Sequence, residues 1–271
     1  GMVNFNPTIA GNINITGGPA DGLISAGNDV TYQGGTVAVN VGQIIGCNES
    51  VGAGVTTASI TTATGDLNVG PFTSSGNAAF TANGVGADII TCGDINSGAG
   101  NLTLQAGTGA NANVQLKNNV TSTGLLTINS GAGAGSNVTL DPAVTVSGGT
   151  TAVNTPQLAL GAGSTLRAST GDLDVQSNAP GSALTVNLAA GSTIVSTNSD
   201  VGFNRTTAGA ITMTGGLGTL QSGGASPQVI FNGGNGVNAV NVDVNNIIGC
   251  AEGSGSTYSI LTQNGDLNVG T

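Results

Sequence analysis

Two segments of the sequence repeat each other, and this repetition constrains the fold more than any other feature. The matching phrases fall in the same order in both segments: VNFN at 3–6 with VGFN at 201–204, IIGC at 44–47 with 247–250, and GDLNVG at 65–70 with 265–270. The offset between matches is 198 at the first phrase, 203 at the second and 200 at the third. Internal repeats of this kind indicate a repetitive architecture. Residues 3–70 and 201–270 are therefore predicted to be two copies of one segment.

The repeat also predicts how the chain is organised. Residues 3–200 form one complete unit, and residues 201–271 begin a second unit that continues from the first without a linker. We interpret Gly1 and Met2 as residues added in cloning, which leaves room for an export signal upstream.

A shorter phrase recurs within the unit, and it predicts secondary structure. It consists of a turn residue, then Asn or Asp, then an apolar–polar–apolar triplet. Examples are GNINI at 11–15, GDLNV at 65–69, GNLTL at 100–104, SNVTL at 136–140 and GDLDV at 171–175. Alternating apolar residues bounded by Gly and Asn indicate short strands joined by tight turns. No window shows a helical period with good helix formers, so the chain is predicted to be all-β.

Two β architectures compete, and the composition favours one of them. A tandem β-sandwich array normally buries large aromatic side chains, but only 3% of these residues are aromatic and none is Trp. A β-solenoid stacks small aliphatic residues over one another and places Gly, Asn and Ser at its corners, which suits a chain with 48 Gly. We therefore expect a right-handed parallel β-helix, with the sandwich array as the alternative. The two copies should superpose and lie about nine coils apart.

The charge of the chain argues against several functions. It has no His, three basic residues and a net charge of −10. Catalysis by general acids and bases usually recruits His, and nucleic acids require clustered Lys and Arg. No apolar run is long enough to cross a membrane. We expect no enzyme activity, no cofactor, no bound metal, no nucleic-acid partner and no membrane insertion.

One pair of acidic residues is a candidate catalytic site. Some β-helices cleave polysaccharides with acidic residues placed beside a basic one. Asp172 and Asp174 are two residues apart and would share one face of a strand. The basic residues are Lys117, Arg167 and Arg205, and none lies near enough in sequence to complete such a site. Finding all three isolated in the structure would therefore argue against a catalytic site.

The three cysteines allow two interpretations. Cys47 and Cys250 occupy the same position in successive copies, and Cys92 ends a similar phrase, IITC at 89–92. One interpretation is a Cys47–Cys92 disulfide with Cys250 left without a partner. The other is three free thiols that serve as small buried hydrophobes. The second is favoured, because two stacked coils separate equivalent positions by about 10 Å and bridged Cα atoms lie within about 7 Å.

One stretch differs in length between the copies and is predicted to be a loop. Three residues are lost between the Cys-containing phrase and the next matching serine, Ser59 in the first copy and Ser259 in the second. Exposed loops tolerate such changes best. We therefore expect a variable surface loop at 48–57 and at 251–257, with Glu49 and Glu252 exposed on it.

The recurring phrases resemble those of a known class of proteins. GNLTLQAG at 100–107 and GDLNVG at 65–70 are similar to the coil repeats of filamentous-haemagglutinin-type adhesins, and similar phrases occur in the passenger domains of autotransporters. This resemblance implies a right-handed β-helical fibre on a bacterial surface. The amino-terminal secretion domain of that family is not recognisable here.

The resemblance leads to a functional expectation. We expect a non-catalytic structural and adhesive stalk segment of a large bacterial repeat protein, secreted or displayed at the cell surface and associated with the outer membrane. The expected partner is a glycan or protein on a host or neighbouring cell. The alternatives are a carbohydrate-active β-helix enzyme and a passive matrix or surface-layer component. Unpaired strands at the two ends of the solenoid also predict end-to-end self-association.

Overall fold

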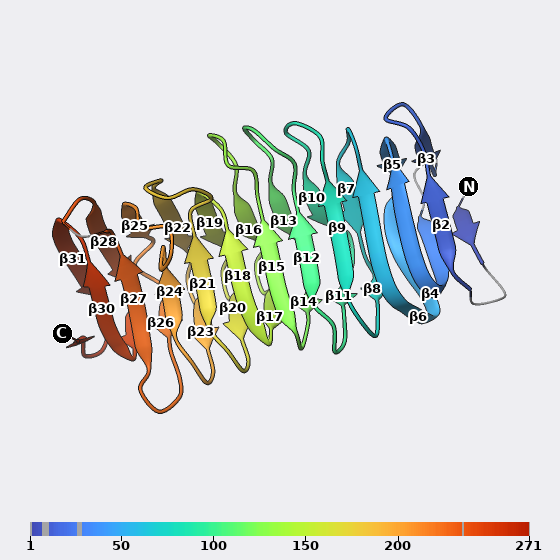
Figure 1. The fold of residues 1–271 in the computed structure, drawn as a ribbon. Coiled ribbons are helices and arrows are strands. Elements are labelled where there is room, and N and C mark those ends of the chain that lie inside the picture. Colours follow the sequence, from blue (N-terminus) through green and yellow to red (C-terminus); the bar gives the residue numbers. More distant parts are fainter. Residues whose placement is uncertain (1, 7–10, 26–28, 235, 271) are drawn as a thin grey trace.

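The protein is a parallel β-solenoid. A computed structural model describes residues 2–6, 11–25, 29–234 and 236–270, and the regular structure in these ranges is all strand. The strands stack side by side along one long axis, with the two ends of the chain at opposite ends of the rod (Figure 1). Every strand pair in the described residues is parallel, which excludes the sandwich array, whose sheets are antiparallel.

Two broad faces run the length of the solenoid. Face 1 contains, in stacking order, β1 (Val3–Phe5), the first part of β4 (Val30–Val41), the first part of β6 (Cys47–Thr62), β7 (Leu67–Val69), β10 (Ile89–Thr91), β13 (Val114–Leu116), β16 (Val138–Leu140), β19 (Gln157–Leu160), β22 (Leu184–Leu188), β25 (Ile211–Thr214), β28 (Ala239–Val244) and β31 (Thr257–Thr262). Face 2 contains β2 (Ile13–Thr16), the later parts of β4 and β6, then β9 (Ala78–Ala82), β12 (Leu102–Gln105), β15 (Leu125–Asn129), β18 (Thr150–Asn154), β21 (Leu173–Gln176), β24 (Val201–Phe203), β27 (Gln228–Asn232), β30 (Cys250–Ser254) and β32 (Asn268–Val269).

The third side of the solenoid changes position along the axis. Near the amino terminus it is the pair β3 (Gly22–Ile24) and β5 (Gln43–Ile45), which follow face 2 in chain order. Later it is face 3, which follows face 1 and contains β8 (Phe72–Thr73), β11 (Ile95–Asn96), β14 (Val120–Thr121), β17 (Thr145–Gly148), β20 (Thr165–Ala168), β23 (Thr193–Ser196), β26 (Thr219–Gln221) and β29 (Asn246–Ile248).

This change places the two sequence copies on different faces. Eight successive pairings lead along face 1 from β1 to β22, and β24, the counterpart of β1, lies on face 2. The second copy therefore starts eight complete coils and part of a ninth coil after the start of the first copy. Superposing it on the first copy would require a rotation about the axis as well as a translation, and that superposition stays a prediction.

Local geometry nevertheless agrees between the copies. Phe5 stacks on Tyr32 with ring centroids 5.7 Å apart, and Phe203 stacks on Phe231 at 5.4 Å. The backbone is left-handed at Asn6 with a φ of 54° and at its counterpart Asn204 with a φ of 52°. In each case the Asn side chain donates a hydrogen bond to the carbonyl of a glycine five residues later, Gly11 or Gly209. Matching phrases therefore fold alike locally, on whichever face they lie.

The core follows from the triplets. Inward and outward residues alternate along each strand, so Leu102 and Leu104 of β12 are fully buried while Thr103 points outward. The parallel register stacks these inward residues on Leu126 and Ile128 of the next coil. Repeated coil after coil, this stacking gives one continuous aliphatic core.

The predicted variable loop is wrong. Glu49 lies within β6, and Glu252 lies within β30, both half-buried. Each strand pairs with neighbours on both sides, so its residues are held in a sheet rather than in a loop. The length difference falls at the corner that follows, where Gly52 and Gly54 have φ values of 69° and 77°. A glycine-containing corner absorbs extra residues without unpairing the strands beside it.

Candidate binding groove

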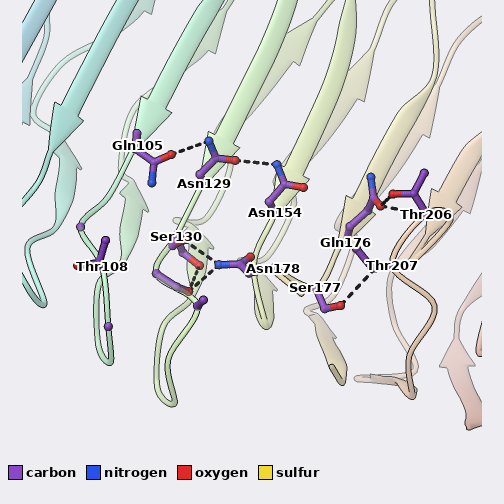
Figure 2. A pocket seen from close by; sticks show the side chains of 14 residues that line it. Gln105, Thr108, Asn129, Ser130, Asn154, Gln176, Ser177, Asn178, Thr206 and Thr207 are labelled. Carbon is purple, nitrogen blue, oxygen red and sulfur yellow. Dashed lines mark hydrogen bonds between the residues drawn. The ribbon is translucent and has the colours of Figure 1, made fainter. Parts of the chain in front are cut away.

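A groove opens between β18 and β19, where the connection between the two faces is short. Most coils join face 2 to face 1 through a projecting loop, for example residues 130–137 between β15 and β16 and residues 177–183 between β21 and β22. Between β18 and β19 only Thr155 and Pro156 connect the two faces. The short turn leaves a gap in the row of loops, and a pocket of about 410 Å³ occupies it. Figure 2 shows this groove, with its lining residues drawn as sticks.

The floor of the groove is a ladder of side-chain amides. Gln105, Asn129, Asn154 and Gln176 are the outward residues at the ends of four successive strands of face 2. Asn129 Nδ2 donates to Gln105 Oε1 at 2.8 Å, and Asn154 Nδ2 donates to Asn129 Oδ1 at 2.7 Å (Figure 2). Parallel stacking places one amide on each coil, about 4.8 Å from the next.

Asn178 forms the bridge across the gap. Its Nδ2 donates at 2.8 Å both to the carbonyl of Ser130 and to that of Gly131, two coils away (Figure 2). Two carbonyls face this end of the amide, so the nitrogen must point toward them and Oδ1 must point away. Asn178 Oδ1 is buried and has no hydrogen-bond donor from the described residues. A buried acceptor without a donor carries a free-energy cost of about 1–3 kcal/mol.

The remaining lining is polar and uncharged. Hydroxyl groups come from Thr108, Ser130, Ser177, Thr206 and Thr207, and the other residues of the lining are glycines and Ala132. Gln176 Oε1 accepts hydrogen bonds from the backbone nitrogen of Thr206 at 3.2 Å and from its hydroxyl. No Asp, Glu, Lys or Arg lines the groove within the described residues. The groove therefore offers hydrogen bonds without a charge.

Comparisons with protein-family models, curated proteins and solved structures found no match for this chain.

A charged cluster lies near one end of the groove. Arg205 Nη1 lies 2.7 Å from Asp172 Oδ2 and 3.4 Å from Asp174 Oδ1, and Arg205 Nη2 lies 3.1 Å from Asp200 Oδ2. Gly202 makes this approach possible, because a Cβ there would lie 2.4 Å from Asp174 Oδ1. The finding that would have argued against a catalytic site, isolation of all three basic residues, is therefore not met, because Arg205 contacts three carboxylates. Arg205 is 33 residues from Asp172 and 31 residues from Asp174 in the sequence. Stacked coils bring residues about 30 positions apart together, so separation along the sequence did not predict this cluster.

The cluster shifts the pKa values of two neighbouring carboxyl groups in opposite directions. Burial by itself raises the pKa of Asp172, but hydrogen bonds from Ser199 and Arg205 and the charge of Arg205 outweigh it, so this pKa lies below its usual range. Burial raises the pKa of Asp174, and the charge of Arg205 offsets this only in part. Oppositely shifted carboxyl groups occur in catalytic pairs and in structural ion-pair networks.

The other basic residues make no ion pair in the described residues. Arg167 donates a hydrogen bond to Thr197 Oγ1 at 3.1 Å, and the Lys117 side chain has no partner among the residues that the structure describes. Across the described residues, no three His, Cys, Asp or Glu side chains are grouped so that they could hold a metal ion. The same part of the chain contains no helix long and apolar enough to cross a membrane.

The structure joins Cys47 to Cys92 in a disulfide, with Cα atoms 6.3 Å apart, so the favoured interpretation of three free thiols is wrong for this pair. Gly70 of the intervening coil comes very close to Gly93 at this corner. A Cβ on Gly70 would lie 2.2 Å from the carbonyl oxygen of Gly93, so only glycine permits the approach. The carbonyl oxygen of Gly70 lies against both sulfur atoms. Cys250 is free and half-buried.

Sequence reasoning missed the groove, although a signal for it exists. An amide follows four of the strand triplets: LTLQ ends at Gln105, LTIN at Asn129, TAVN at Asn154 and LDVQ at Gln176. The position after an inward residue points outward, so the recurrence predicts an outward column of amides. The gap itself could be read only from the two-residue connection at Thr155.

Proposed function

We propose that this chain is a non-catalytic structural and adhesive segment of a large bacterial repeat protein, secreted or displayed at the cell surface. The observation that carries the proposal is the amide-floored groove, set in a solenoid whose faces run unbroken along its axis. Extended repeat surfaces suit contact with other extended molecules. The resemblance of the coil phrases to those of filamentous-haemagglutinin-type adhesins supports the same assignment.

Retention of coated beads on cells tests adhesion. Beads carrying the purified chain should stay on layers of epithelial or bacterial cells several times more often than beads carrying serum albumin. Beads carrying the chain with Asn154→Asp should be retained less often, because this change puts a charge on the groove floor. Retention equal to that of albumin beads on every cell type would overturn adhesion and favour a passive matrix component.

The Arg205 cluster favours a second candidate, a carbohydrate-active enzyme. Asp172 and Asp174 share a cation and have oppositely shifted pKa values, as the acid and base of a hydrolase do. Incubation with soluble polysaccharides would release reducing ends if this candidate is correct, and Asp172→Asn and Asp174→Asn would each abolish the release. No release from any polysaccharide, with beads still retained, would leave adhesion as the function.

A further inference from the structure

We infer that the groove binds an uncharged, hydroxyl-rich glycan chain that lies along the solenoid axis across Gln105, Asn129, Asn154 and Gln176. This inference deepens the proposed adhesive function and rests on it, because it names the ligand of the same surface.

Charge selects the class of ligand. The lining contains no ionised side chain to pair with a charged ligand. The chain as a whole carries a net charge of −10, which repels sulfated or uronic-acid polymers. A cationic ligand would find no carboxylate on the groove floor. An uncharged ligand loses the least on leaving water for this surface.

The hydrogen-bonding groups of the groove that have no partner among the described residues favour a ligand with hydroxyl groups. Asn129 and Asn154 each use one side-chain N–H along the column and keep the other. Gln176 accepts from Thr206 through Oε1, which leaves its Nε2 available. Sugar hydroxyls accept hydrogen bonds and carry no charge, so a single kind of group satisfies all of these N–H donors.

The repeat along the axis indicates a chain rather than a small molecule. Four amides on successive coils span about 14 Å at about 4.8 Å per coil. An extended peptide usually binds by adding a strand to an exposed sheet edge. The groove floor is a face, and its strands already pair with neighbours on both sides. The geometry therefore favours a glycan over a peptide.

Titration with defined oligosaccharides tests the inference. The probes are cellohexaose, maltoheptaose and mannohexaose, with a heparin hexasaccharide as the charged probe and a Gly-Ser peptide as the uncharged peptide probe. Side-chain amide signals are followed by NMR, and affinities are measured by calorimetry. At least one uncharged oligosaccharide should shift the amide signals of Asn129, Asn154 and Gln176, and neither the heparin nor the peptide probe should shift them.

A matched pair of variants locates the site. Asn154→Asp should weaken binding about fivefold or more, since one hydrogen bond contributes about 1 kcal/mol. Asn241→Asp makes the same change on the exposed side of β28, away from the groove, and should leave affinity unchanged. Unchanged circular dichroism would show that both variants fold.

Each result has a distinct meaning for the two proposals. Binding of the heparin or the peptide probe at the amides, or equal weakening by both variants, would overturn the glycan inference. Absence of binding by all three uncharged oligosaccharides, while beads still adhere and adhesion survives Asn154→Asp, would overturn the inference and leave the adhesive function standing. Binding in the groove by a chain whose beads do not adhere would support the glycan site and overturn the adhesive function.

Discussion

The hexapeptide at 65–70 and its identical copy at 265–270 have different environments. Leu67 and Val69 are fully buried, because β7 is flanked by β6 and β10. Leu267 is half-buried and Val269 is 69% exposed, because β32 pairs only with β30 among the described residues. Identical residues therefore differ in burial according to whether a further coil covers them. In a solenoid, stability is a property of neighbouring coils rather than of one sequence.

The cysteines extend the comparison. Cys47 faces Asn68 in the parallel register, and Cys250 faces Asn268 in the same way. The preceding glycines, Gly46 and Gly249, have φ values of 129° and 127°. Only Cys47 has a strand with a cysteine, Cys92, stacked on the far side. The two cysteines thus share a local structure but differ in whether a strand with a second cysteine stacks on the next coil.

The largest expected effect comes from making one substitution in both hexapeptides. Leu67→Ala should lower the free energy of unfolding by about 2–5 kcal/mol, since it leaves a cavity in a covered core. Leu267→Ala should cost less than half as much, because part of that side chain already contacts solvent. Urea unfolding monitored by circular dichroism measures both. Equal losses would contradict the view that the neighbouring coil decides stability.

Adding a coil should make the two copies alike. A copy of residues 71–96 appended after Gly270 would cover β32 as β10 covers β7, and Leu267→Ala should then cost about 2–5 kcal/mol. In oxidised glutathione, Cys250 and the appended copy of Cys92 should form a disulfide by thiol–disulfide exchange, releasing two molecules of reduced glutathione.

The thiol of Cys250 should then resist alkylation. An appended coil with Ser in place of the Cys92 copy is the matched control, in which Cys250 stays reactive. An unchanged cost for Leu267→Ala, or an alkylatable Cys250 in the cysteine-containing version, would show that the second copy does not accept this coil.

Removing the cysteines should have a somewhat smaller effect. The double variant Cys47→Ser/Cys92→Ser should lose about 2–4 kcal/mol, because the disulfide closes a long loop and restricts the unfolded chain. Cys250→Ser should lose about 0.5 kcal/mol or less, as expected for a half-buried side chain without a partner. Thermal unfolding under non-reducing conditions compares the stability of the variants. Similar losses of stability in both would contradict the view that, of the cysteines, only the Cys47–Cys92 pair stabilises the fold.

The smallest change in the free energy of unfolding is expected at Arg205, a charged residue of the second copy. Arg205→Gln should cost about 1–2 kcal/mol at pH 7, between the values for exposed and buried ion pairs. The lowered pKa of Asp172 means that its contribution is present above the ordinary Asp pKa near 4 and is lost as the pH falls below it. The difference between wild type and variant should therefore shrink below pH 4.

Asp174 acts in the opposite direction. Its raised pKa means that its charged form opposes folding at neutral pH, so Asp174→Asn should be neutral or slightly stabilising at pH 7. Urea midpoints between pH 3 and pH 7 measure both effects. A pH-independent cost for Arg205→Gln would indicate that Arg205 acts through packing alone.

Much of the fold was predictable, because each triplet carries its own strand signal. GNLTL at 100–104 predicted β12, and its inward Leu102 and Leu104 are buried as the alternation requires. The variable loop was mispredicted at Glu49, because a length difference between copies does not reveal whether a corner or a loop absorbs it. The groove was missed at Thr155, because its walls come from coils on either side of that turn.

The sequence by itself determined the local structure of this protein. The alternation of apolar and polar residues sets which side chains point inward, and glycines and asparagines with a positive φ set the corners; both depend only on residues close together in the chain. The tertiary structure decided everything that joins one coil to the next: the Cys47–Cys92 disulfide, the Arg205 cluster, the groove and the rotation of the second copy onto the other face. These depend on how many residues each coil contains, since that number sets which side chains stack.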